Sequence, residues 1–102
     1  MTHELKGFVF EWIERNRHSV IEACDALWRT PEVAMEEVKT SLILRNWLSK
    51  EGFQVETGTS GMPTAFVEEF ARGSGKPVIG FLTDMDAVPG VSNKVVPWHE
   101  PI

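Results

Sequence analysis

The sequence has a single cysteine, no long apolar run and no stretch rich in basic residues, and each shortage excludes a class of protein. Cys24 cannot form an internal disulfide, so the fold does not depend on one. No segment is long and apolar enough to span a bilayer, and residues 1–10 lack the apolar core and small-residue cleavage site of a signal peptide. We therefore expect a cytoplasmic protein with no membrane partner.

The charge of the chain argues against nucleic acid as a partner. The formal net charge is -5, and the 10 basic residues are interspersed among 15 acidic ones. Neutralising a run of phosphates needs a basic stripe, which this sequence lacks. With 42% hydrophobic and 25% charged residues, the composition is that of a globular chain. A length of 102 residues allows one domain, or part of one.

Apolar residues from about Glu4 to Trp28 recur three or four positions apart, which predicts a long amphipathic helix, either continuous or broken around Asn16 to Ser19, where four polar residues interrupt the apolar stripe. Cys24 is at one of these apolar positions, where we expect a small buried side chain. Tryptophans at the same spacing are expected to serve as core anchors. The helix must end near Thr30, because Pro31 disfavours helical geometry in the residue before it.

A second helix is predicted from Glu36 to Glu51. Gly52 directly follows it and is placed to adopt the left-handed conformation that ends helices. The predicted buried face of this helix consists of Val38, Leu42, Trp47 and Leu48, with Ile43 or Leu44 at its border.

The period changes from about 3.6 to 2 after the second helix. Residues 53–56 and 64–70 alternate as half-buried strands do, and residues 57–63 between them indicate a loop. Residues 78–82 are continuously apolar, which is typical of a strand buried on both faces. We expect this segment to be the central strand of a larger sheet. Residues 1–102 are accordingly interpreted as an incomplete, amino-terminal portion of a domain.

Two carboxylates, Asp84 and Asp86, follow this predicted strand. In open α/β sheets ligands bind at the carboxyl ends of the strands. Side chains two residues apart on an extended chain share one side, where two carboxylates suit a metal site as ligands or as groups that orient a ligating histidine. By spacing alone, two solvated acids before a turn explain the pattern at least as well.

Four segments, taken in order, resemble a known family. They are WRTPE at 28–32 followed by Glu36 and Glu37, LSKEGFQV at 48–55, GMPTAF at 61–66 and PVIGFLTDMDAVP at 77–89. The first resembles a signature of Pro-Glu, four residues and Glu. The ordered set is similar to the amidohydrolases of metallopeptidase family twenty, which are related to aminoacylase and carboxypeptidase G, and nearest to their aminobenzoyl-glutamate utilisation branch.

The resemblance implies an α/β fold, namely the amino-terminal part of a phosphorylase/hydrolase-like three-layer domain with two helices and then about three strands. It also implies a parent enzyme that holds divalent metal, zinc or manganese, and uses it to activate water. That water would hydrolyse a small amide or peptide substrate such as an N-acyl amino acid.

Within this resemblance Asp86 matches an aspartate that orients a metal-binding histidine. Asp84 stands where that histidine would be, so it is a weak candidate and the chain offers no confident metal ligand. His99, in a proline-rich loop, has too few ligating neighbours for a zinc site. The later Gly-His-Gly-Cys-Gly-His segment and the general-base glutamates of the family are absent from these 102 residues. We expect the chain alone to bind no metal and to be inactive.

Two other outcomes stay open. The chain can instead be a non-catalytic α/β interaction or binding module, which its missing ligands favour. Open strand edges and uncovered apolar faces also allow the chain to associate with itself.

Overall fold

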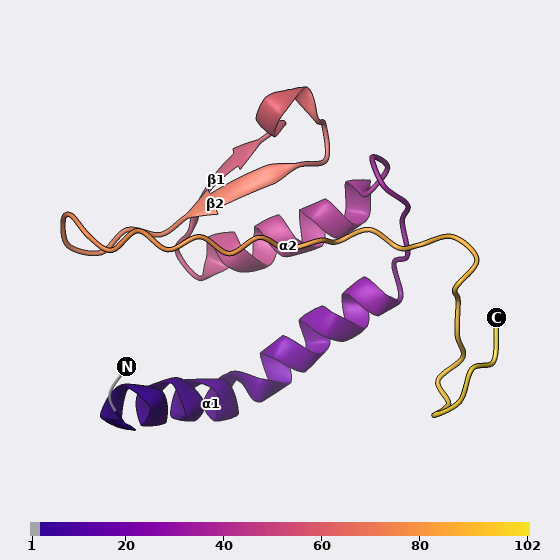
Figure 1. Ribbon diagram of the computed structural model, residues 1–102, viewed down its shortest axis with the longest axis horizontal. Helices are drawn as coiled ribbons and strands as arrows, with labels where there is room; N and C mark the ends of the chain where they lie inside the picture. Colours follow the sequence, from indigo (N-terminus) through magenta and orange to yellow (C-terminus); the bar gives the residue numbers. More distant parts are fainter. Residues whose placement is uncertain (1–2) are drawn as a thin grey trace.

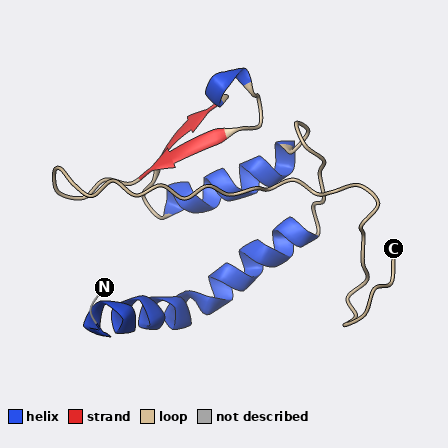
Figure 2. Cartoon of the chain, viewed as in Figure 1, coloured by secondary structure: helices blue, strands red, loops and turns tan. Residues whose placement is uncertain are grey.

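The computed structural model describes residues 3–102 and consists of two helices, a β-hairpin and a long extended tail (Figure 1). The elements are helix α1 (His3–Trp28), helix α2 (Val38–Lys50), strand β1 (Gln54–Thr57), the short 3-10 helix η1 (Thr59–Gly61) and strand β2 (Phe66–Glu69). Helix α2 lies between α1 and the hairpin, and contacts both. The chain after β2 has neither helix nor strand (Figure 2). The predicted α/β class is confirmed.

Helix α1 forms without interruption over the predicted residues and ends two residues before Thr30. The Thr30 hydroxyl donates to the carbonyl of Ala26 at 2.8 Å. No residue of α1 is buried. The predicted burial of Cys24 and Trp28 is wrong, because both are exposed. The reason is that, among the elements within residues 3–102, only α2 has substantial contact with α1, so most of the apolar stripe of α1 stays uncovered.

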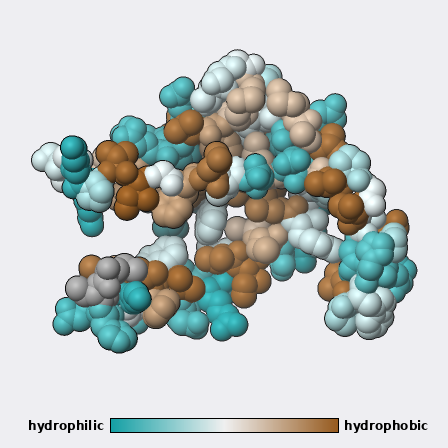
Figure 3. Space-filling view, in the orientation of Figure 1, coloured by the Kyte–Doolittle hydropathy of each residue, from teal (hydrophilic) through white to brown (hydrophobic). Residues whose placement is uncertain are grey.

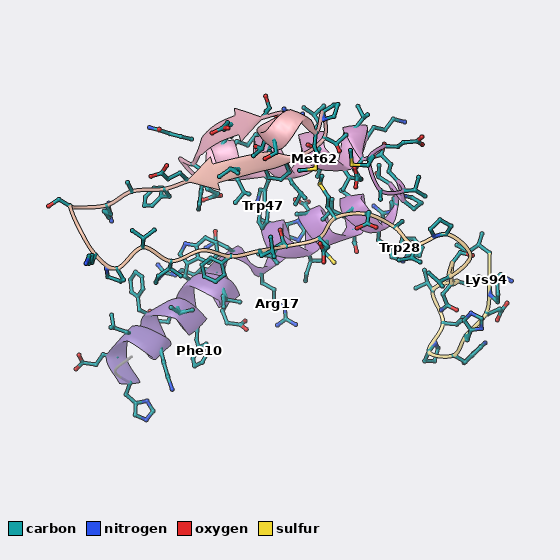
Figure 4. The ribbon with its side chains drawn as sticks, turned by 45° about the horizontal axis from the view of Figure 1, so that its top comes forward. Phe10, Arg17, Trp28, Trp47, Met62 and Lys94 are labelled. Atoms are coloured by element: carbon teal, nitrogen blue, oxygen red, sulfur yellow. The ribbon has the colours of Figure 1, made fainter. Side chains whose placement is uncertain are left out.

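Helix α2 is shorter than predicted, and its predicted apolar face is covered only in part, since Leu48 and the border residues Ile43 and Leu44 are half-buried. Val38 and Leu42 are exposed, whereas Thr40 and Ser41 are buried. Trp47 is half-buried, as predicted, and its Nε1 donates to the Ser19 hydroxyl of α1 at 3.3 Å (Figure 4). Apolar periodicity was wrong at the start of α2, because two hydroxyl residues are buried there through hydrogen bonds instead.

The two strands predicted after α2 form an antiparallel hairpin, with Gln54 opposite Glu69 and Thr57 opposite Phe66. Phe66 and Glu68 are half-buried, and the residues that alternate with them in β2 are exposed. Gly52, before the hairpin, has the expected left-handed conformation, with φ of 94°.

The predicted central strand at residues 78–82 is not present. Its apolar side chains are exposed, 99% in the case of Leu82 and 91% in the case of Val78. No backbone hydrogen bond of residues 78–86 occurs within the part of the chain that the structure describes. A strand that is apolar on both faces needs neighbouring strands and covering helices. Residues 3–102 provide neither around this segment.

The chain is expanded for its length. Its radius of gyration is 16.5 Å, whereas a compact domain of this size has about 13 Å. The space-filling view shows hydrophobic side chains spread over the surface and an open gap beside the first half of α1 (Figure 3). Among the described residues no hydrophobic side chain is buried. No helix within residues 3–102 is both long enough and apolar enough to cross a membrane.

Candidate functional site

The buried side chains of the described residues are all polar, and they surround the connection between α1 and α2. They are Glu37, Thr40, Ser41 and Thr64. We call residues 30–37 the motif turn, because they contain the Pro-Glu, four residues, Glu signature. The hydrogen bonds of this turn join three of the four segments that carry the family resemblance.

Glu32 caps the amino terminus of α2. Its carboxylate accepts from the backbone amide of Thr40 at 2.6 Å and from that of Lys39 at 3.2 Å. The first amides of a helix have no partner within the helix, so an acceptor here stabilises the helix start. Glu37, at the N-cap position itself, makes no such side-chain bond. The cap therefore comes from a residue five positions earlier in the chain.

The hydroxyl of Thr40 links the same turn to the end of α1. It lies 2.7 Å from Oε1 of Glu32 and 3.1 Å from the carbonyl oxygen of Thr30, and can donate to either. Thr40 is only 2% exposed. A buried hydroxyl needs a partner, and these two acceptors satisfy it.

Glu37 ties the hairpin loop to the start of α2. Its carboxylate accepts a hydrogen bond of 2.7 Å from the hydroxyl of Thr64. Both residues are 7% exposed. Thr64 belongs to the GMPTAF segment, so this bond joins the second half of the signature to a motif 27 residues later.

The loop that carries the candidate aspartates is anchored to the motif turn through the main chain. The amide of Ala87 donates to the carbonyl oxygen of Glu32 at 2.7 Å. Glu32 thus holds α2 with its carboxylate and the acidic loop with its backbone. Asp86 is the residue directly before this anchor.

Two glutamates of the turn, Glu32 and Glu37, are held in the ionised form by hydrogen bonds. The Thr40 amide lowers the pKa of Glu32, and the Thr64 hydroxyl lowers the pKa of Glu37, in each case from an ordinary 4.5. Burial and, less strongly, the charge of Glu32 oppose this lowering of the Glu37 pKa without reversing it. A lowered pKa means that these bonds stabilise the fold above about pH 4.5, and that this contribution is lost as the pH falls through the lowered values.

The predicted site residues Asp84 and Asp86 are both exposed, and Met85 between them is half-buried. Neither carboxylate forms a hydrogen bond or ion pair with any described residue. A cleft of about 460 Å³ does exist in the molecule, but neither aspartate lines it. Its walls are Trp12, Trp47, Leu48, Glu51, Phe53 and Phe70. The buried strand that was predicted to deliver these acids to a crevice is not formed within residues 3–102, and the role of the two aspartates stays a prediction.

The residues present do not fit a metal centre. Within residues 3–102 no three His, Cys, Asp or Glu side chains gather closely enough to hold an ion, and zinc takes three or four protein ligands. His99 is exposed in a loop. The neighbouring Glu100 pairs with Lys94, which lowers the pKa of that carboxyl, and it also accepts from the indole of Trp98.

The sequence patterns did not reveal the hydrogen-bond partners of Glu32, Glu37 and Thr64. They appear in motifs, yet periodicity gives no reason for a buried glutamate or threonine. The sequence did contain a usable signal for the cap. An acid precedes a helix whose own first residues offer no capping side chain, and a threonine lies within the first turn of that helix.

No protein-family model matches the chain. It is 34% identical over 91 residues to a subunit of p-aminobenzoyl-glutamate hydrolase of Escherichia coli (strain K12), a match that covers 89% of the chain and 18% of that protein. It is 39% identical over 66 residues to N-acetyldiaminopimelate deacetylase of Oenococcus oeni (strain ATCC BAA-331 / PSU-1), a match that covers 62% of the chain and 17% of that protein. The chain thus spans less than a fifth of the length of these curated relatives.

Proposed function

Because the chain belongs to the amidohydrolases of metallopeptidase family twenty, we propose that it forms part of a cytoplasmic, metal-dependent enzyme that hydrolyses the amide of an N-acyl amino acid. The names of both relatives support this substrate class. One substrate name describes a p-aminobenzoyl group on glutamate, and the other an acetyl group on diaminopimelate. In the proposed enzyme a divalent ion, zinc or manganese, would supply the water molecule activated for attack on the amide.

The contribution of these 102 residues is structural support for the acidic loop. Since the described residues do not fit a metal centre, we assign them no step at a metal ion. Asp86 is proposed to orient a ligating side chain that belongs to polypeptide outside residues 3–102. Asp84 is the weaker second candidate. The observation that carries the proposal is the bond from the Ala87 amide to the Glu32 carbonyl, which fixes the loop next to Asp86 onto the motif turn.

A chimeric enzyme tests this function. In it, the matched segment of the Escherichia coli hydrolase is replaced by this chain, and release of p-aminobenzoate from p-aminobenzoyl-glutamate is measured. We expect the chimera to turn over the substrate and the 102-residue chain alone to be inactive. Asp86→Ala should lower kcat of the chimera at least tenfold, because a ligand that is not held in orientation binds metal less well.

Glu69→Ala is the matched control, because Glu69 is an exposed acid on the outer face of the hairpin. It should leave turnover unchanged. Circular dichroism and gel filtration establish that each variant is folded. A folded Asp86→Ala chimera with the turnover of its parent removes Asp86 from the proposal.

A non-catalytic binding module is the second candidate, and the lack of a gathered metal-ligand set within the described residues favours it. The two candidates differ in what the chimera does. A folded chimera that retains bound metal but has no turnover, even with Asp86 intact, supports the module.

A further inference from the structure

Glu32 is joined to two parts of the molecule by two different groups. Its carboxylate accepts hydrogen bonds from the amides of Lys39 and Thr40 at the start of α2. Its main-chain carbonyl accepts a bond of 2.7 Å from the amide of Ala87. The extended tail crosses the connection between α1 and α2 at this bond (Figure 1). A change that moves the main chain of Glu32 therefore also moves the residue that follows Asp86.

The carboxylate is the group that fixes the main chain of Glu32. Within residues 3–102 the amide of Glu32 donates to no acceptor, and its carbonyl accepts from Ala87 alone. The remaining hydrogen bonds of the residue all come from its side chain, including the one of 2.7 Å from the Thr40 hydroxyl. Without the carboxylate, the only hydrogen bond that Glu32 keeps among the described residues is the one to the acidic loop itself.

The turn between Glu32 and α2 contains a strained residue, so it can relax when a tether is lost. Met35 has φ of 70°, in the left-handed region that is unfavourable for a residue with a side chain. Such a conformation persists when the surrounding contacts impose it. Met35 is exposed and lies between Glu32 and Glu37, whose carboxylates are both hydrogen-bonded. We therefore expect the main chain of the turn to shift when Glu32 loses its carboxylate.

We propose that Glu32 is a positioning residue for Asp86. The carboxylate of Glu32, held on the start of α2, fixes its own main chain, and its carbonyl then fixes the amide next to Asp86. The carboxylate of Asp86 is thereby held at one place relative to α2, although it has no side-chain partner among the described residues. This inference rests on the proposed function only for its effect on turnover.

Amide hydrogen exchange in the 102-residue chain, followed by NMR, tests the coupling between the cap and the loop. In the parent, the amide of Ala87 should exchange more slowly than those of Asp86 and Val88, which donate to no described residue. Glu32→Ala should accelerate exchange at Ala87 roughly 2- to 30-fold, the range for loss of a helix cap. Glu32→Gln keeps an acceptor and should restore part of the protection.

Glu36→Ala is the matched control. It removes an exposed carboxylate from the same turn, and this carboxylate has no partner among residues 3–102. Exchange at Ala87 should be unchanged in this variant. Two results would overturn the proposal. One is a Glu32→Ala chain in which Thr40 exchanges faster and Ala87 does not, and the other is equal acceleration of Ala87 in Glu36→Ala.

Turnover of the chimeric enzyme tests whether the positioning acts through Asp86. Glu32→Ala should lower kcat about 2- to 10-fold, less than the loss of Asp86 itself, because the carboxylate of Asp86 is kept but held less well. KM should stay the same, since Asp86 is assigned to a metal ligand and not to the substrate. Glu32→Gln should recover part of kcat, and Glu36→Ala should leave it unchanged.

The double variant separates positioning from a general structural effect. In a chimera that already carries Asp86→Ala, adding Glu32→Ala should lower kcat no further, because the residue that it positions is gone. An equal loss of kcat with and without Asp86 would overturn the proposal. A parent chimera without turnover would instead overturn the proposed hydrolase function. Exchange at Ala87 in the 102-residue chain would then decide alone whether Glu32 holds the loop, so the two failures are distinguishable.

Discussion

Removing the carboxylate of Glu32 should loosen the start of α2 without disturbing the rest of the helix. In Glu32→Ala the amides of Lys39 and Thr40 lose their acceptor. The next amide, that of Ser41, donates to the backbone carbonyl of Glu37 at 2.9 Å, so it keeps its bond. Within α2 the effect should therefore be confined to two adjacent amides.

The size of the effect follows from the geometry. Loss of an N-cap shifts the local opening equilibrium roughly 2- to 30-fold, and we expect exchange at these amides to accelerate within that range. The Thr40 amide should change more, because its bond is 2.6 Å long and that of Lys39 is 3.2 Å. Glu32→Gln keeps a neutral acceptor, and its exchange rates should fall between those of the parent and Glu32→Ala.

Amide hydrogen exchange followed by NMR measures this, with Ser41 as the internal reference. Glu36→Ala is the matched variant, because Glu36 is exposed in the same turn and its side chain has no hydrogen-bond partner among residues 3–102. Acid should reproduce the Glu32→Ala effect as the pH falls through the lowered pKa of Glu32. Unchanged exchange at Lys39 and Thr40 in Glu32→Ala, or equal acceleration in Glu36→Ala, would refute the assignment of the cap.

Two more predictions concern the hairpin. Thr64→Val should raise the pKa of Glu37 toward 4.5 in an NMR titration, because the hydroxyl that favours the ionised form is gone. Thr59→Val should not, since the Thr59 hydroxyl has no partner within residues 3–102, and an equal shift in both would contradict the bond. Glu68→Gln should raise Tm at pH 7, because burial raises the pKa of Glu68, against the attraction of Arg45, so its charge destabilises the fold as the pH rises above 4.5. Glu69→Gln, at an exposed position of the same strand, is its control, and a Tm gain no larger than the control's would count against this reading.

Local patterns in the sequence were sufficient to place both helices and the two strands of the hairpin, but not the pairing of those strands. The three-to-four-residue spacing of apolar side chains marked α1, and Gly52 marked the end of α2. These signals depend on the chain within a few residues of each position. They do not depend on what lies across the fold, so they hold in a chain whose described residues form no apolar core.

Burial could not be predicted in the same way. Cys24 and Leu42 are apolar and correctly spaced, yet both are exposed because no described element covers their side of the helix. Residues 78–82 do not form the predicted strand for the same reason. A continuous apolar run is stable as a strand only between neighbouring strands, and the described residues do not provide them. The position of Asp86 beside the motif turn depends on one main-chain bond, which no side-chain pattern encodes.

The motif turn explains why an ordered set of weak motifs is more informative than any one of them. Glu32, Glu37 and Thr64 come from two different motif segments, and each needs a partner outside its own short stretch of sequence. Without the hydroxyl of Thr64, the carboxylate of Glu37 would be a charge at a buried position that lacks this hydrogen bond. The residues are therefore favoured as a set, in a fixed order along the chain. The acidic loop joins the set through its backbone alone, so the side chain of Asp86 takes no part in holding the turn and is left available for chemistry.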